Sequence, residues 1–333
     1  MKVLIRSFFL SVMAVMVAGL LAVQAEARTL KINEDLGPGS TEAKALERFK
    51  ELVAKKTNGE LEIEIYLQTA LGDMQTSFEN LMSGTLDLYS GALSYYAKLI
   101  PDELGVSAVF YLFKDNDHLR RYLHSPVFEK GHDKLKEMGI RFISTDFRGD
   151  RGPYRIFVST KPALTLEDFQ GVKMRMWAND IAVRAWKHIG ANPVIIPWQE
   201  VYVSIRQGLV SAVTSGVNAI HDQKFTEVAP YITELRQFPQ TWPITVSEKV
   251  YQSLSPAHQK ALVEAANEAT AYYGELSLAS GEKNIQEMIS KNNAVYSRIN
   301  TDPFVKKMES YYKQLIKEGI IKQEIYDEIM RLR

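Results

Sequence analysis

The sequence predicts an α/β protein with two lobes and a hinge between them, and three observations lead to this fold class. The chain has 333 residues, which is enough for two domains of ordinary size. Patterns typical of strands and helices alternate along most of it, as expected of α/β units. Residues 146–155 and 234–244 separate two such units, so the chain is expected to cross between the lobes twice.

The first unit opens with a strand, a helix and a second strand. Residues 29–36 read as a short strand that the run from Gly37 to Ser40 ends. Residues 41–58 carry an apolar stripe at helical spacing, and Gly59 supplies a stop signal. Residues 60–67 have an apolar side chain at every second position, which is typical of a strand with one buried face. This order of elements predicts a parallel sheet.

The alternation continues through the rest of the chain. A helix (74–84), a strand (85–90), a helical region (116–138) and a strand (140–147) complete the first unit. The second unit is predicted to contain strands at 154–160, 171–177, 192–197 and 210–215, with helices at 180–189 and 199–207. From Pro256 onward helix dominates, with one very long helix to residue 292 and two short helical stretches at 304–318 and 323–333.

These elements set the expected limits of the lobes. Lobe I takes residues 28–147 plus about 237–255, and lobe II takes residues 148–236 with the C-terminal helices of about 256–333. The long helix among them is expected to bridge both lobes. In open α/β sheets ligands bind beyond the carboxyl ends of the strands. A cleft between the lobes is therefore the expected ligand site.

Residues 1–27 are predicted to be a cleaved signal peptide rather than part of the fold. They begin with Lys2 and Arg6, continue with an uncharged run from Ser7 to Gln24, and end on small residues, which is the pattern of a secretory signal. The alternative is a membrane anchor, because the run approaches the length of a transmembrane helix. Polar sequence follows at once, so we expect cleavage and export. The lack of cysteine fits a bacterial periplasmic protein.

Several functional classes lack their motifs in this sequence. The formal net charge is zero, whereas nucleic-acid binding favours a basic surface, so no nucleic-acid partner is expected. None of the six histidines belongs to an H-x-H or H-E-x-x-H metal pattern, and neither a P-loop nor a G-x-S-x-G nucleophile motif occurs. We therefore do not expect an enzyme, a metal site or a cofactor.

Two arginines lie in strands that are otherwise apolar or aromatic. Arg155 belongs to the strand at 154–160, and Arg175 lies near the carboxyl end of the strand at 171–177. A buried guanidinium needs an anion, because an unpaired buried charge is costly, and its planar fork matches a carboxylate. Two interpretations stay open at this point. The anion is either a bound ligand or an internal carboxylate such as Asp146 or Asp150.

Longer phrases of the sequence resemble one family of exported binding proteins. They include FKELVAKKTNGELEIEIY, LGDMQTSFENLMSGTLDLYSG, YRIFVSTKPALTLEDFQGVKMRMW, IGANPVIIPWQEVYVSIRQGLVSAV and SEKVYQSLSPAHQKALVEAA. Their succession resembles the extracytoplasmic solute receptors of tripartite ATP-independent periplasmic (TRAP) transporters, the DctP family, over nearly all of the chain after residue 27.

The resemblance implies a function as well as a fold. It implies a monomeric, two-lobed periplasmic binding protein that closes on a small organic acid carboxylate. The receptor would hand this ligand to a TRAP permease with a small and a large membrane subunit, for secondary uptake. The alternative is the same fold used to present a ligand to a sensor kinase.

The resemblance also implies ligand-binding residues. Arg175 falls on the principal arginine of the family's G-x-K-x-R strand motif, and Arg155 falls on its second arginine. Many members carry Asp-Gly-x-Glu-Asn after the next helix, where this sequence has SAVTSGVN. The resemblance therefore implies that Ser215 takes the place of the family asparagine, with Thr214 beside it. Asn218, three residues later, is the alternative residue for this role.

Aromatic residues are frequent at the expected cleft positions. The candidates for the site are Tyr95, Phe147, Trp177, Trp198 and Trp242. Binding pockets combine a few orienting polar groups with apolar walls, and core packing is the alternative role for each of these residues. The sequence therefore favours a monocarboxylate with an apolar or aromatic body over a highly hydroxylated sugar acid.

Overall fold

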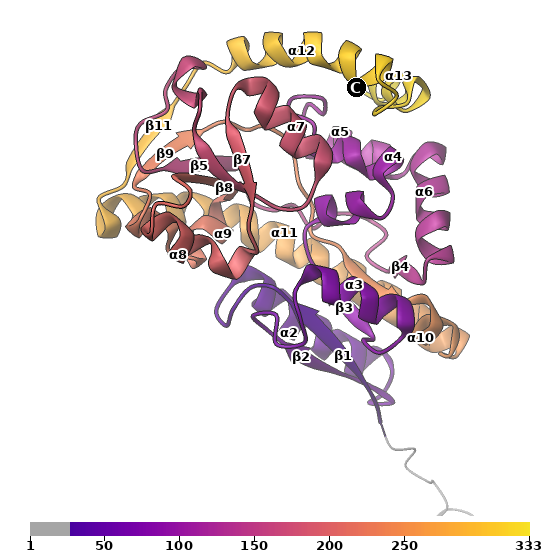
Figure 1. The fold of residues 1–333 in the computed structure, drawn as a ribbon. Coiled ribbons are helices and arrows are strands. Elements are labelled where there is room, and N and C mark those ends of the chain that lie inside the picture. The colour runs from indigo at the N-terminus through magenta and orange to yellow at the C-terminus, as the bar shows by residue number, and fades with distance from the viewer. Residues whose placement is uncertain (1–26) are drawn as a thin grey trace, which may run out of the picture.

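The computed structural model describes residues 27–333, so the predicted signal peptide lies outside the described residues except for Ala27. The described chain forms two separate sheets with helices packed around them (Figure 1). Each sheet is the centre of one lobe. The predicted two-lobed α/β fold is therefore confirmed.

The first lobe is built on a five-stranded sheet. Its strands are β1 (Arg28–Glu34), β2 (Leu61–Tyr66), β3 (Leu88–Ser90), β4 (Ile140–Phe142) and β10 (Ile244–Ser247), in the order β2-β1-β3-β10-β4. β1 pairs in parallel with β2 and β3, whereas β10 runs antiparallel to β3 and β4. The expectation of a parallel sheet is wrong for β10, because this strand enters from the second crossing and not from a strand–helix–strand unit.

The first lobe also contains helices, some of which pack against this sheet and some against one another. They are α2 (Thr41–Lys56), α3 (Met74–Ser83), α4 (Pro101–Leu104), α5 (Asn116–Leu123), α6 (Pro126–Glu137) and α10 (Glu248–Gln252). Ser40 caps α2 by accepting a hydrogen bond from Ala43 N at 3.0 Å. The helical region predicted at 116–138 contains two helices, because Ser125 caps α6 and Pro126 begins it.

The second lobe is built on a six-stranded sheet. Its strands are β5 (Arg155–Ser159), β6 (Lys173–Met176), β7 (Asn192–Ile195), β8 (Ala212–Gly216), β9 (Tyr231–Glu234) and β11 (Val295–Arg298), in the order β11-β9-β5-β8-β6-β7. β6 is parallel to β7 and β8, whereas β5 is antiparallel to β8 and β9. The helices α7 (Asp180–Ile189), α8 (Val201–Arg206) and α9 (Val217–Asp222) belong to this lobe. This sheet is also mixed.

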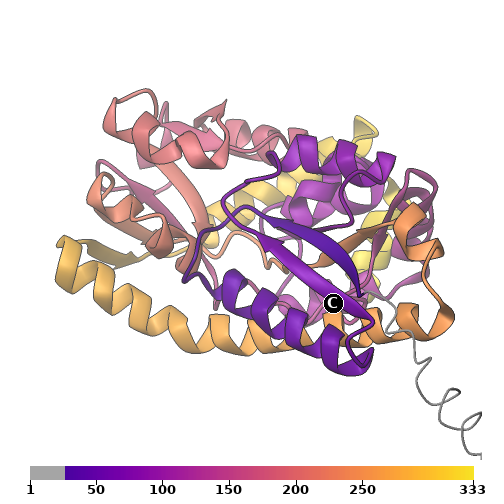
Figure 2. The same cartoon turned by 90° about the horizontal axis from the view of Figure 1, so that it is seen from below.

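The long helix α11 (Pro256–Asn292) spans both lobes (Figure 2). Near its start Lys56 of α2 lies 2.7 Å from Glu268, and further along Ser277 accepts a hydrogen bond from Asn218 of α9. Gly274 lets the first crossing segment lie directly against the helix, because a Cβ atom there would stand 2.4 Å from Arg148 O. The helix is thus in contact with both lobes and with the segment between them.

The C-terminal helices α12 (Asp302–Lys317) and α13 (Gln323–Arg331) make a second connection between the lobes (Figure 1). The ring of Tyr311 in α12 stacks on His188 of α7 with centroids 4.1 Å apart. In the first lobe, His118 of α5 donates from Nε2 to Ile329 O of α13 at 2.8 Å.

No helix within residues 27–333 is long and apolar enough to cross a membrane.

Candidate functional site

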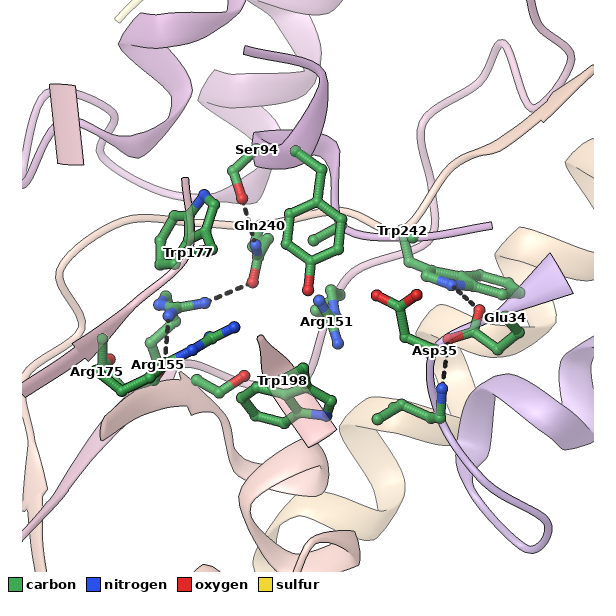
Figure 3. Close-up of a pocket in the computed structure, with 16 residues that line it drawn as sticks. Glu34, Asp35, Ser94, Arg151, Arg155, Arg175, Trp177, Trp198, Gln240 and Trp242 are labelled. Atoms are coloured by element: carbon green, nitrogen blue, oxygen red, sulfur yellow. Dashed lines mark hydrogen bonds between the residues drawn. The ribbon is translucent and has the colours of Figure 1, made fainter. Parts of the chain in front are cut away.

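A cavity lies between the two lobes, at the carboxyl ends of β1, β6 and β8 (Figure 3). The space between its lining side chains is about 430 Å³ when the open solvent at its mouth is included. Both lobes and both crossing segments contribute to its lining: Glu34, Asp35, Leu36, Gly91, Ala92, Ser94, Tyr95, Arg151, Arg155, Arg175, Trp177, Trp198, Thr214, Ser215, Gln240 and Trp242. The position agrees with the general rule for ligand sites in open α/β sheets.

Arg155 enters the cavity from the first residue of β5, and only 3% of it is exposed. Its Nη1 donates to Gln240 Oε1 at 2.6 Å and its Nη2 donates to Thr214 O at 2.9 Å, whereas Nε has no partner among the described residues. The guanidinium lies 4.6 Å from the ring centre of Phe238. Burial, and after it the charge of the neighbouring Arg151, lower the pKa of Arg155 to about 9. The environment therefore disfavours its charge.

Arg175 enters from β6 and is 5% exposed. Among the described residues its one hydrogen bond runs from Nε to Ile196 O at 2.8 Å. Its guanidinium lies 5.0 Å from the ring centre of Trp198, a cation–π distance. Burial lowers the pKa of Arg175 to about 10. The outer nitrogens of its fork remain available to a group in the cavity.

Within residues 27–333, neither of these arginines forms an ion pair with a carboxylate. Asp150 is engaged by Arg120 at 3.0 Å instead, and Asp146 is exposed. The interpretation that an internal carboxylate neutralises Arg155 and Arg175 therefore fails for the described part of the chain. Burying two positive charges without an anion costs free energy. An anion that enters the cavity would reduce this cost.

Two buried acids line the opposite side of the cavity, at the end of β1 (Figure 3). Glu34 accepts hydrogen bonds from Ser90 Oγ, Trp242 Nε1 and Leu36 N at 2.6, 3.0 and 3.1 Å. Asp35 accepts one from Tyr89 Oη at 3.1 Å through Oδ1. Burial raises the pKa of both carboxyls, and their mutual repulsion raises that of Glu34 further. The pair is therefore favoured to hold a proton.

Arg151 lies between the two arginines and the two acids (Figure 3). Its Nη2 stands 3.4 Å from Glu42 Oε1, and Tyr273 donates to the same oxygen at 2.8 Å. Glu42 belongs to α2 and is 1% exposed. Arg151 is thus held by an internal carboxylate, in contrast to Arg155 and Arg175.

The cavity contains most of the residues that the sequence assigns to the site. Arg175, Arg155, Ser215, Thr214, Trp177, Trp198, Tyr95 and Trp242 line it. Asn218 lies outside the lining, because it follows the turn into α9 and donates from Nδ2 to Ser277 of α11. Phe147 is also outside, since it packs in the core of the first lobe with Phe128 and Phe142. The expectation that these two residues line the cleft is corrected.

The sequence reasoning missed five polar residues of the lining. Glu34, Asp35, Arg151, Ser94 and Gln240 line the cavity without having been assigned to it. Glu34 and Asp35 stand directly at the carboxyl end of a predicted strand, so the rule that favoured Arg175 could have found them. Arg151 and Gln240 lie in the two crossing segments, where no periodic pattern indicates which side chains point inward.

The lobes touch one another around the cavity. Asn179, at the start of α7, donates to Ser94 O of the first lobe at 3.2 Å. Gln199 donates to Asp35 O at 3.3 Å, and Gln240 donates to Ser94 Oγ at 3.0 Å. The hydrogen bonds of Asn179 and Gln199 join the two lobes directly, whereas that of Gln240 joins the second crossing segment to the first lobe. Together they describe a closed arrangement in which the cavity is enclosed on several sides.

Comparisons with known proteins are consistent across most of the chain. Residues 32–318 match the model of a family described as bacterial extracellular solute-binding protein, family 7. A solute-binding protein of Sulfitobacter sp. is 30% identical over 256 residues, which cover 76% of each chain. The 2,3-diketo-L-gulonate-binding periplasmic protein of Escherichia coli is 26% identical over 83% of this chain and 84% of its own length.

Solved structures share the fold. A TRAP periplasmic solute-binding protein from Chromohalobacter salexigens with bound D-glucuronate matches with a TM-score of 0.83 at 23% identity, over 91% of this chain and 100% of that chain. One from Sulfitobacter sp. with bound β-D-galacturonate matches with a TM-score of 0.82 at 21% identity, over 92% and 99%. At these sequence identities the similarity to the two solved structures supports a shared fold and no more.

Proposed function

Because the chain belongs to the DctP family of bacterial extracellular solute-binding proteins, we propose that it is the periplasmic receptor of a TRAP transporter. In this role it binds a small organic acid anion between its lobes and delivers it to the small and large membrane subunits of a permease. It acts by capture and release and does not convert its ligand chemically. The predicted signal peptide would bring it to the periplasm.

One observation carries the proposal. Arg155 and Arg175 are buried side by side at the cavity without a carboxylate partner among the described residues. A ligand carboxylate would supply the missing anion, and the free nitrogens of the Arg175 fork suit two parallel hydrogen bonds to it. Binding would then remove the cost of burying two like charges.

The lining also bears on the class of acid. The sequence favoured an apolar or aromatic body, but the cavity places Glu34, Asp35, Ser94, Arg151 and Gln240 among its aromatic walls. Such a polar lining suits a ligand with several hydroxyl groups. The related solved proteins whose descriptions name D-glucuronate and β-D-galacturonate support this choice. We therefore propose a hydroxylated monocarboxylate.

Substitution of Arg175 tests the proposal. We expect Arg175→Ala to lose about 2–5 kcal/mol of binding free energy, because it removes one partner of a buried charge pair. This corresponds to a loss of roughly 30- to 4000-fold in affinity. Arg175→Lys should recover only part of it, since an ammonium cannot make the bidentate contact, and Arg155→Ala should lose less.

The measurement is isothermal titration calorimetry with acids that stabilise the wild-type protein in a thermal-shift screen of sugar acids, hydroxy acids and aromatic acids. Arg184→Ala is the matched control, because Arg184 lies on α7 with 53% of its side chain exposed and away from the cavity. Binding by Arg175→Ala that equals binding by the wild type would refute the assignment of this residue.

A further inference from the structure

The cavity has two ends of opposite character. Arg155 and Arg175 stand on the side of the second lobe, whereas Asp35 stands across from them on the side of the first lobe (Figure 3). A ligand whose carboxylate lies on the arginines therefore directs its other end toward Asp35. The chemistry of that end decides which ligand fits.

The Asp35 carboxylate offers an acceptor to the cavity. Oδ1 already accepts from Tyr89 Oη at 3.1 Å, whereas Oδ2 accepts no hydrogen bond from the described residues. The residue is 8% exposed, so bulk water does little to solvate this oxygen when the lobes are closed. A donor on the ligand, such as a hydroxyl group, would satisfy Oδ2.

The charges around the cavity leave room for one ligand anion. Arg151, Arg155 and Arg175 carry three positive charges, and Glu34, Asp35 and Glu42 carry three negative charges when all are ionised. One proton shared by the buried pair Glu34 and Asp35 leaves a single positive charge for a ligand to neutralise. A dianion would require both acids of the pair to be protonated.

We infer that Asp35 selects against a second carboxylate and for a neutral hydrogen-bond donor at the end of the ligand distant from the arginines. The inference rests on the proposed function and names the residue that sets its specificity. A second carboxylate would face Oδ2 across a desolvated cavity, and like charges in such a place repel strongly. Arg151 offsets only part of this repulsion, because its charge acts on both Asp35 and Glu42, and its Nη2 stands 3.4 Å from Glu42 Oε1.

Matched pairs of acids provide the test. D-Gluconate and D-glucarate differ only in a terminal hydroxymethyl or carboxylate group, and D-galactonate with galactarate, and erythronate with meso-tartrate, differ in the same way. Calorimetric affinities of the wild type and Asp35→Asn are measured for all six acids. Asparagine can keep Oδ1 on Tyr89 and turns an amide donor toward the cavity, so it should accept the second carboxylate.

The inference predicts at least a 10-fold preference of the wild type for the monocarboxylate of a pair that it binds. It also predicts that Asp35→Asn lowers the ratio of monocarboxylate affinity to dicarboxylate affinity at least 10-fold, because this variant binds the dicarboxylate more tightly than the wild type does. Arg175→Ala, measured in the same way, should lose affinity for both the monocarboxylate and the dicarboxylate of the pair. A thermal midpoint of Asp35→Asn close to that of the wild type shows that the variant is folded, and a wild-type-like ratio in that variant overturns the inference.

The result separates this inference from the function on which it rests. A wild type that binds the dicarboxylate as tightly as the monocarboxylate, through Arg175, overturns the role of Asp35 and leaves the receptor function standing. A wild type that binds acids of this set with affinities that Arg175→Ala leaves unchanged overturns both.

Discussion

Glu34 shows how a single residue of the cavity couples folding to pH. It lies within the first lobe, is 2% exposed, and accepts three hydrogen bonds from Ser90, Trp242 and Leu36. Its pKa rises from the ordinary 4.5 to about 8, mainly because the carboxyl is buried and secondly because Asp35 and Glu42 lie nearby. The folded protein therefore keeps a proton that the unfolded chain gives up.

This difference predicts a loss of stability with rising pH. Below pH 4.5 the carboxyl is protonated in both states, whereas between pH 4.5 and about 8 only the folded state holds the proton. The free energy of unfolding should therefore fall as pH rises through this window. Chemical denaturation at several pH values checks this, and Glu34→Gln should flatten the slope because an amide does not titrate. A slope that Glu34→Gln leaves unchanged would contradict the assignment.

At the scale of elements, the sequence predicts the strands and helices whose pattern is local. The stripe of α2 and the alternation of β2 are present as expected, with Leu61 and Ile63 buried in the sheet. The strands β9, β10 and β11 were not predicted. Each has four residues and gains its stability from partners far away in the sequence, so no local periodicity reveals it.

The residues of the candidate site also divide into those that a local sequence pattern indicates and those that only the folded structure shows. Arg155 and Arg175 drew attention as charges in largely apolar strands, but the family resemblance was needed to assign them to the ligand site. Asn218 was misplaced because counting along the chain from a family pattern takes no account of the turn into α9, which directs its side chain to α11. Glu34 and Asp35 were missed because acids at a strand end are commonly solvated.

The start of α7 is the element that joins the second lobe to the first beside the cavity. Asn179 accepts from Ala182 N at 2.9 Å as the N-cap of α7, and its Nδ2 donates to Ser94 O at 3.2 Å. One side chain thus serves the helix and the contact between lobes. An aspartate at this position can keep the cap but cannot donate to Ser94 O.

We therefore predict that Asn179→Asp weakens ligand binding about 10-fold, an effect of roughly 1.4 kcal/mol, without lowering the thermal midpoint of the ligand-free protein. The affinity falls because the closed form loses a hydrogen bond and gains a repulsive pair of oxygens. Calorimetry and thermal unfolding measure the two effects, and Asn179→Ala, which also loses the cap, should lower both. Unchanged affinity in Asn179→Asp would show that this contact does not hold the lobes together.

At the scale of the whole molecule, α11 and the pair α12–α13 connect the lobes while the cavity charges resist their closure. α11 contacts both lobes, and α13 reaches the first lobe through His118 and Ile329. Closure without a ligand would bury Arg155 and Arg175 together without an anion, which is unfavourable. The ligand-free protein should therefore favour an open arrangement.

Solution scattering checks this balance. We predict a larger radius of gyration for the ligand-free wild type than for the protein saturated with an acid that it binds, as in hinge closure of other two-lobed receptors. The double variant Arg155→Met and Arg175→Met should be compact without ligand, because no buried charge opposes closure. Arg120→Met is the control, since Arg120 pairs with Asp150 outside the cavity. Equal radii of the wild type with and without ligand would indicate a rigid pocket.

Three of the four tryptophans of the chain, Trp177, Trp198 and Trp242, line the cavity. Trp198 lies beside the guanidinium of Arg175 and Trp177 beside that of Arg155, at 5.0 and 5.5 Å. The emission of an indole ring responds to nearby charge and water, and a bound acid changes both at these rings. The fourth tryptophan, Trp186, lies in the core and outside the lining, so three of the four indole rings that selective excitation of tryptophan reports on stand at the cavity. Binding of an acid as proposed should therefore change the tryptophan emission directly, without a dye or a fused reporter.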